Sequence, residues 1–180
     1  MQDHAGWHRA VRYRADPALA RERAAARTTA YVYGNIILFA TVIPLTAADL
    51  HHHHAALLVL GVAASTYLAH VFADIIGHQV KSGTPLDRPG RRRELRDALP
   101  IVSSAWVPAL LLFLGGLGWL PERGAVLAAE GYLLLRMALV GLVVERLRSD
   151  ERVSLRTLLS GLLLAAAAAA IAIVKAILGH

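Results

Sequence analysis

Five stretches of mostly apolar residues alternate along the chain with short stretches rich in charged residues. The apolar stretches lie at approximately 28–49, 55–77, 99–120, 124–145 and 156–178. Each is close to the ~20 residues that an α-helix needs to cross ~30 Å of hydrocarbon. The pattern therefore predicts an all-α, polytopic membrane protein with five transmembrane helices.

The charged stretches predict how these helices are oriented. Nearly all basic residues fall before the first span, between the second and third, or between the fourth and fifth: Arg9, Arg12, Arg14, Arg21, Arg23, Arg27, Lys81, Arg88, Arg91, Arg92, Arg93, Arg96, Arg146, Arg148, Arg152 and Arg156. The other side has only Arg123, with Lys175 near the end of the last span. Because cytoplasmic loops are enriched in lysine and arginine, we expect the amino terminus in the cytoplasm and the carboxyl terminus outside, in the inner membrane.

Two cytoplasmic segments carry helix signals of their own. Residues 1–27 form a basic amphipathic segment in which Asp16 and Pro17 are typical of a helix start, so we expect a helix that continues into the first span. The turn-rich loop from Ser82 to Gly90 is followed by a charged helix start from Arg91 to Asp97. The chain thus divides into the segment 1–27 and a transmembrane domain, 28–180.

Composition agrees with the membrane interpretation and limits the chemistry. Hydrophobic residues make up 56% of the chain, more than is typical of soluble domains. A net charge of +6 would suggest nucleic acid in a soluble protein, but here the basic residues flank apolar spans, so we expect membrane lipid and not nucleic acid as a partner. The absence of cysteine excludes disulfides and thiolate metal sites, and no cofactor is expected.

Polar residues inside the spans are the main functional candidates, because an ionisable side chain at membrane depth is costly unless it is paired or hydrated. Counting along the helices places Asn35, His70 and Arg136 roughly 10–14 Å from the cytoplasmic ends of their spans. We expect these three to form one polar layer. Arg136 remains charged at this depth, and Asp74 or His70 is its expected partner.

A second pattern extends this layer toward the cytoplasm. His70, Asp74 and His78 are spaced four residues apart, which places them along one stripe of the second span, and Thr66 lies one turn further outward. A carboxylate beside an imidazole fixes its tautomer, as a proton relay requires. The alternative is that these residues only pair helices together.

Three further sets of residues have weaker functional patterns. Glu130 and Lys175 lie near the outer surface on the last two spans and are candidates for helix pairing. A run of histidines in the first outer loop is a weak candidate for zinc, copper or nickel: His51, His52, His53 and His54. Small residues predict helix contacts, among them Gly61 with Ser65 and Gly115 with Gly116.

Several short motifs together suggest a family. They are Tyr33-Gly34, the stretch from Leu68 to Ala73, Leu99-Pro100, Pro108 and the closing stretch from Ile173 to His180. From about Arg27 onward the chain resembles a family of small five-helix integral membrane proteins of high-GC bacteria, to which no activity is assigned. Arg27 before the first span, with a histidine in the second, also looks like prokaryotic relatives of the endolysosomal potassium and proton channel. Their Phe-Ser-Asp motif and sixth helix are missing, with Tyr33-Gly34-Asn35 standing at the motif.

These patterns lead to one functional expectation and two alternatives. We expect a channel or transporter for a proton or small monovalent cation, formed by a homo-oligomer because five helices leave little room for an internal pore. The alternatives are a non-catalytic membrane scaffold or accessory subunit, and an intramembrane enzyme acting on a lipid. No phosphate loop, nucleophile elbow or metalloprotease motif supports the enzyme.

Overall fold

The described part of the chain is a bundle of α-helices. This computed structural model describes residues 17–140 together with 159, 163, 166–170, 173 and 177. Its elements are α2 (Pro17–Val42), the 3-10 helix η1 (Ala47–His53), α3 (His54–Ser82), α4 (Arg88–Asp97), α5 (Leu99–Gly116) and α6 (Glu122–Ala138). The prediction of an all-α fold is confirmed for these residues, and α2 begins at Pro17 and continues into the first apolar stretch as expected.

Local sequence explains where these helices begin and end. Helix α3 ends at Gly83, which adopts a left-handed φ of 67° as helix C-caps often do. Helix α4 begins where the Asp87 side chain accepts a hydrogen bond from the Gly90 amide, at 2.8 Å. Helix α5 follows α4 almost directly, and Gly118 with φ 75° makes the turn toward α6.

The first predicted span is shorter in the structure than in the sequence pattern. Helix α2 stops at Val42, two residues before Pro44, and the chain turns into η1. Leu45, inside the predicted stretch, and Leu50, just after it, are buried over the end of the bundle core. They are apolar because they close the core, not because they continue a membrane-crossing helix.

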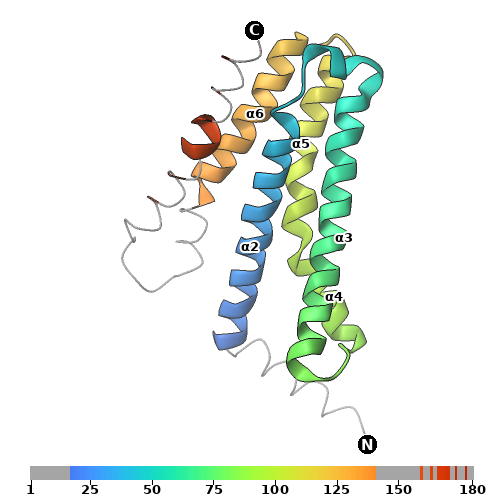
Figure 1. Ribbon diagram of the computed structural model, residues 1–180, viewed down its shortest axis with the longest axis vertical. Coiled ribbons are helices and arrows are strands. Elements are labelled where there is room, and N and C mark those ends of the chain that lie inside the picture. Colours follow the sequence, from blue (N-terminus) through green and yellow to red (C-terminus); the bar gives the residue numbers. More distant parts are fainter. Residues whose placement is uncertain are drawn as a thin grey trace, which may run out of the picture.

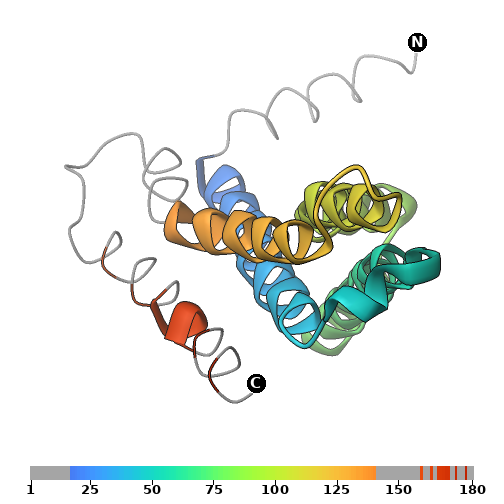
Figure 2. The ribbon, with the colours of Figure 1, turned by 90° about the horizontal axis from the view of Figure 1, so that it is seen from above.

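The two helices at the centre of the bundle are α2 and α5, with α3 packed on one side of them and α6 on the other (Figures 1 and 2). Their shared core contains Leu38, Val59, Leu112 and Leu133, all fully buried. The helical residues 166–170 contribute Ala168 to the same core. The remainder of the predicted fifth span, and the fourth beyond residue 140, lie outside the described residues.

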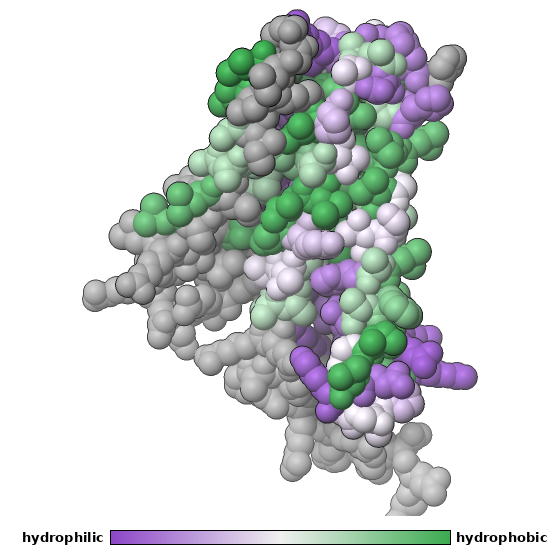
Figure 3. Space-filling view, in the orientation of Figure 1, coloured by the Kyte–Doolittle hydropathy of each residue, from purple (hydrophilic) through white to green (hydrophobic). Residues whose placement is uncertain are grey.

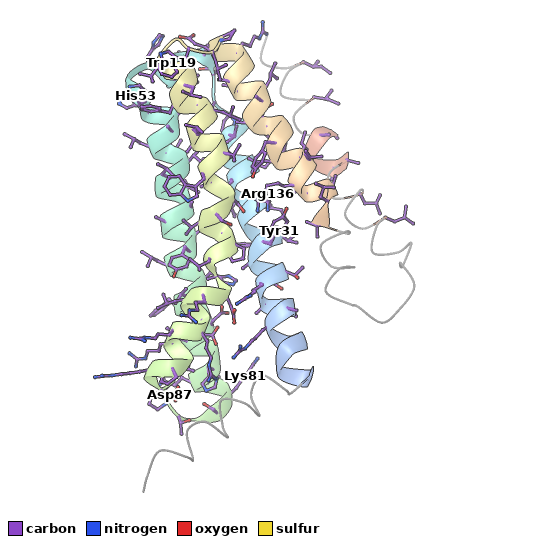
Figure 4. The ribbon with its side chains drawn as sticks, turned by 180° about the vertical axis from the view of Figure 1, so that it is seen from behind. Tyr31, His53, Lys81, Asp87, Trp119 and Arg136 are labelled. Carbon is purple, nitrogen blue, oxygen red and sulfur yellow. The ribbon has the colours of Figure 1, made fainter. Side chains whose placement is uncertain are left out.

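The segments between helices alternate between the two ends of the bundle. Lys81 and Asp87 lie at the end where α3 meets α4, whereas His53 and Trp119 lie at the opposite end (Figure 4). The start of α2 lies at the α4 end as well, because Arg27 Nε is 2.8 Å from Asp97 Oδ1. The basic segments before the first span and between the second and third therefore share one end.

Two helical stretches of the described residues are long and apolar enough to cross a membrane, His54–Ser82 and Arg88–Gly116. Only 28% and 44% of their most apolar windows are buried inside the structure, which is little for core helices of a soluble protein. Leu68, Phe72 and Trp106 are 64–67% exposed. In the face shown in Figure 3, apolar side chains gather around the middle of the bundle and hydrophilic ones at its two ends.

Candidate functional site

A pair of ionisable side chains on α3 forms the first polar site. His70 Nε2 lies 3.4 Å from Asp74 Oδ2, one helical turn away. The His70 ring also stacks on the ring of Tyr33 from α2, with centroids 6.1 Å apart. The imidazole is therefore held between a carboxylate and an aromatic face. The His70 side chain is 18% exposed and that of Asp74 41%, so the pair passes from the packed bundle toward solvent.

The Asp74 side chain lines a cavity at the basic end of the bundle. This cavity has a volume of about 520 Å³ and lies between α2, α3 and α4. Its walls carry charged side chains of both signs: Arg23, Asp74, His78, Lys81, Arg93, Glu94 and Asp97. A charged and open cavity is a place where water and small ions reach Asp74, with His70 one turn deeper.

The second polar site surrounds Arg136 of α6 and involves no carboxylate among the described residues. Arg136 Nη1 donates to Tyr132 Oη at 3.0 Å, and Nη2 donates to Ser104 Oγ at 3.1 Å. The guanidinium carbon lies 4.6 Å from the centroid of the Tyr31 ring and 5.6 Å from that of Tyr132. Neutral oxygens and aromatic faces thus hold this cation, in contrast to the expected pairing with Asp74 or His70.

Tyr31 joins this second site to Asn35. Its hydroxyl donates to the Arg136 carbonyl at 3.1 Å, and its own carbonyl accepts from Asn35 Nδ2 at 2.6 Å. Asn35 is fully buried, and its Oδ1 atom, like Arg136 Nε, has no hydrogen-bond partner in the described structure. Two groups of the predicted layer therefore share one aromatic residue. Figure 4 shows Tyr31 next to Arg136.

Helix α2 separates the two polar sites. Tyr31 faces Arg136 on the α6 side, whereas Tyr33 faces His70 on the α3 side. Residues two apart on a helix differ by about 3 Å in height and about 200° in direction. The contacts of Arg136 and those of His70 thus lie on two sides of α2, and the polar layer expected from depth stays a prediction. The fixed charge of Arg136 is kept apart from the His70–Asp74 pair.

The remaining candidates are spread over the molecule. Thr66 is half-buried one turn outward from His70, and His78 is exposed in the cavity wall. Glu130 is buried, while its proposed partner Lys175 lies outside the described residues. The hydroxyl of Ser104, which accepts a hydrogen bond from Arg136, itself donates to the Pro100 carbonyl at 2.7 Å.

The outer histidines do not converge. His51 Nε2 is 4.0 Å from Glu122 Oε1, and the His53 ring packs against Phe113 with centroids 4.6 Å apart. Asp49 is occupied by the amide and hydroxyl of Thr46, both at 2.7 Å. Among the residues whose side chains the structure describes, no three metal-ligating groups lie close enough together to hold an ion. His52 and His54 remain candidates from sequence only.

Sequence reasoning missed the tyrosines, which organise both sites. Tyr31, Tyr33 and Tyr132 lie in predicted spans; Tyr33 belongs to a family motif, but none of the three was predicted to contact a polar residue. The available signal was the spacing of Tyr132 and Arg136, four residues apart on one helix, which brings the hydroxyl to the guanidinium.

The chain was also compared with known proteins. No family model, curated protein or solved structure matches it.

Proposed function

We propose that the chain is an integral protein of the cytoplasmic membrane with five spans, its amino terminus in the cytosol and its carboxyl terminus outside. Support comes from the exposed apolar side chains around the middle of the bundle, and from the basic segments gathered at one end. Such an end belongs on the cytoplasmic side by the distribution of lysine and arginine in membrane proteins. The resemblance to small five-helix membrane proteins of high-GC bacteria is part of the same proposal.

The proposed activity is transport of a proton or small monovalent cation through a homo-oligomer. The observation that carries it is the charged cavity with Asp74 in its wall and His70 Nε2 3.4 Å from that carboxylate. A proton that enters the cavity protonates Asp74 and passes to the His70 imidazole, whose Nε2 atom lies 3.4 Å from that carboxylate. Arg136 does not contact an ion on this route, because α2 and its tyrosines lie between Arg136 and the His70–Asp74 pair.

The route beyond His70 requires a second subunit. Inside the protomer the level above His70 is filled by buried apolar side chains, among them Leu38, Val59 and Leu112. Thr66 lies outward of His70 on α3, a helix with much of its apolar surface exposed. We therefore place the outer part of the path between copies of the chain.

The activity is tested with purified protein in liposomes that enclose a pH-sensitive dye. Under an imposed proton gradient, we expect flux that falls at least tenfold in His70→Ala and in Asp74→Asn. Gln79→Ala is the matched control, because Gln79 is exposed on α3 near the same end and lies outside the cavity wall. A wild-type chain that releases no proton gradient, or variants that conduct like the control, would contradict the proposal.

A second function is favoured by the surroundings of Arg136. Its guanidinium is held by groups from α2, α5 and α6, an arrangement that locks three helices together. A membrane scaffold or accessory subunit needs only such a stable arrangement of helices. The liposome assay separates the two functions, because a scaffold gives no flux and its His70 and Asp74 variants change stability alone.

A further inference from the structure

The exposed face of α4 carries a row of arginines. Arg88, Arg92 and Arg96 are spaced four residues apart, so their side chains follow one stripe of the helix, and all three are exposed. Within the described part of the chain, no ion pair engages any of them. The stripe therefore presents three positive charges along about 12 Å of helix.

The carboxylates near α4 are committed elsewhere. Asp87 accepts the Gly90 amide at the start of the helix, and Asp97 is 2.8 Å from Arg27 of α2. Glu94 lies in the wall of the charged cavity, together with Asp97. Asp97 thus connects α4 to α2, and Asp87 caps the start of α4 itself; neither forms an ion pair with the arginine stripe.

Helix α4 is also fixed in place, unlike the solvated tether that a basic loop usually forms. The Tyr67 hydroxyl of α3 donates to the Leu95 carbonyl at 3.1 Å. At the junction with α5, Ala98 and Ile101 are buried against Val71. A side chain at Gly90 would meet Leu86 and Asp87, so the start of the helix is closely packed too. The arginines consequently project from a rigid support.

Two leucines flank the stripe at the end that joins α5. Leu95 and Leu99 are 39% and 52% exposed, and each follows an arginine of the stripe by three residues, which makes them neighbours on the helix surface. Exposed apolar groups beside cations, at the border between a charged helix and an apolar one, match the boundary between headgroups and acyl chains.

We infer that the Arg88–Arg92–Arg96 stripe is a binding site for anionic phospholipid headgroups of the cytoplasmic leaflet. Arginine forms paired hydrogen bonds to phosphate oxygens, and the neighbouring leucines contact the upper part of the acyl chains. A nucleic acid would use the charge but not the leucines. This inference depends on the proposed membrane embedding, and it adds a defined lipid class and a defined site to it.

The test is native mass spectrometry of the full chain in neutral detergent, titrated with short-chain phosphatidylglycerol or phosphatidylcholine. We expect the wild type to bind phosphatidylglycerol more tightly, and the affinity to fall roughly fivefold for each arginine changed to glutamine. Arg123→Gln removes an exposed arginine near the opposite end and is the matched control. Changing the three arginines to lysine keeps the charge but removes the paired hydrogen bonds, so it should retain only part of the preference, and added salt should weaken it.

Three outcomes would overturn the inference. The first is equal binding of the two lipids to the wild type, and the second is a glutamine variant that keeps the preference. The third is competition by millimolar inorganic phosphate as strong as that by the lipid, which would indicate a site for a soluble anion. Alkaline carbonate extraction of the same membranes tests the embedding separately. A chain that is released by carbonate contradicts the membrane proposal and this inference together, whereas a retained chain without lipid preference contradicts this inference alone.

Discussion

Replacing Tyr31 with leucine is expected to lower the free energy of unfolding by about 3 kcal/mol. The phenol ring lies 4.6 Å from the Arg136 guanidinium carbon, and its hydroxyl donates to the Arg136 carbonyl. A desolvated cation–π contact contributes about 2 kcal/mol and a hydrogen bond about 1 kcal/mol. Without Tyr31 the cation keeps its charge but loses a ring face, while its Nε already has no partner.

A double-mutant cycle isolates this contribution. In the Arg136→Met background, Tyr31→Leu should cost only about 1 kcal/mol, because no buried cation remains to be stabilised. Unfolding in SDS titrations of the purified protein measures all four states. Tyr33→Leu is the matched control, since Tyr33 lies two residues away on α2 but stacks on His70. The same loss with and without the arginine would show that Tyr31 does not stabilise the charge.

Substituting Gly34 with alanine is expected to destabilise the protein by about 1–3 kcal/mol, the usual cost of overpacking. A Cβ atom at this position would lie 2.9 Å from the Ile101 Cα atom, so the backbones of α2 and α5 must move apart. Because these are the two central helices of the bundle, their separation also disturbs the packing around Asn35.

Gly61→Ala provides the comparison in the same unfolding assay. A Cβ at Gly61 meets no atom within 4 Å, and alanine favours a helix over glycine by about 1 kcal/mol. We therefore expect Gly61→Ala to unfold at the same or a higher SDS concentration than the wild type. If the two variants behave alike, α2 and α5 do not approach each other as closely as the structure has them.

The order of elements was predictable because one periodic signal, apolar stretches separated by basic ones, dominates the sequence. Arg27 and the α4 segment share one end of the bundle, as the charge pattern indicated. The helix limits were less predictable. Leu45 and Leu50 are as apolar as a span residue, and only the folded bundle reveals that they cover its end.

The partners of polar residues depend on helix rotation, which depth does not determine. Counting residues predicted similar depths for His70 and Arg136. Successive residues of a helix point about 100° apart, however, so depth does not give direction, and α2 lies between His70 and Arg136. Which small residues lie at helix contacts also depends on helix rotation, so the sequence predicted these contacts only in part. Gly115 and Gly116 do meet Leu50, whereas Gly61 faces outward and Gly34 lies where α2 closely approaches α5. His70 and Asp74 were predictable as a pair because their spacing lies within one helix.

In the proposed arrangement, hydrocarbon surrounds the middle of this bundle while its basic end lies in the cytosol. The natural absence of cysteine allows a direct measurement, because each introduced cysteine is the only reactive thiol. Thr84→Cys marks the basic end, Arg123→Cys the opposite end, and a cysteine added after His180 the carboxyl terminus. All three are labelled in spheroplasts with a maleimide that does not cross membranes.

We predict that Arg123→Cys and the added carboxyl-terminal cysteine are labelled in intact spheroplasts, whereas Thr84→Cys is labelled only after lysis. Labelling of Thr84→Cys and the carboxyl-terminal cysteine from the same side would contradict the five-span orientation. Equal labelling of all three before and after lysis, or of none until lysis, would contradict a bundle that crosses the membrane.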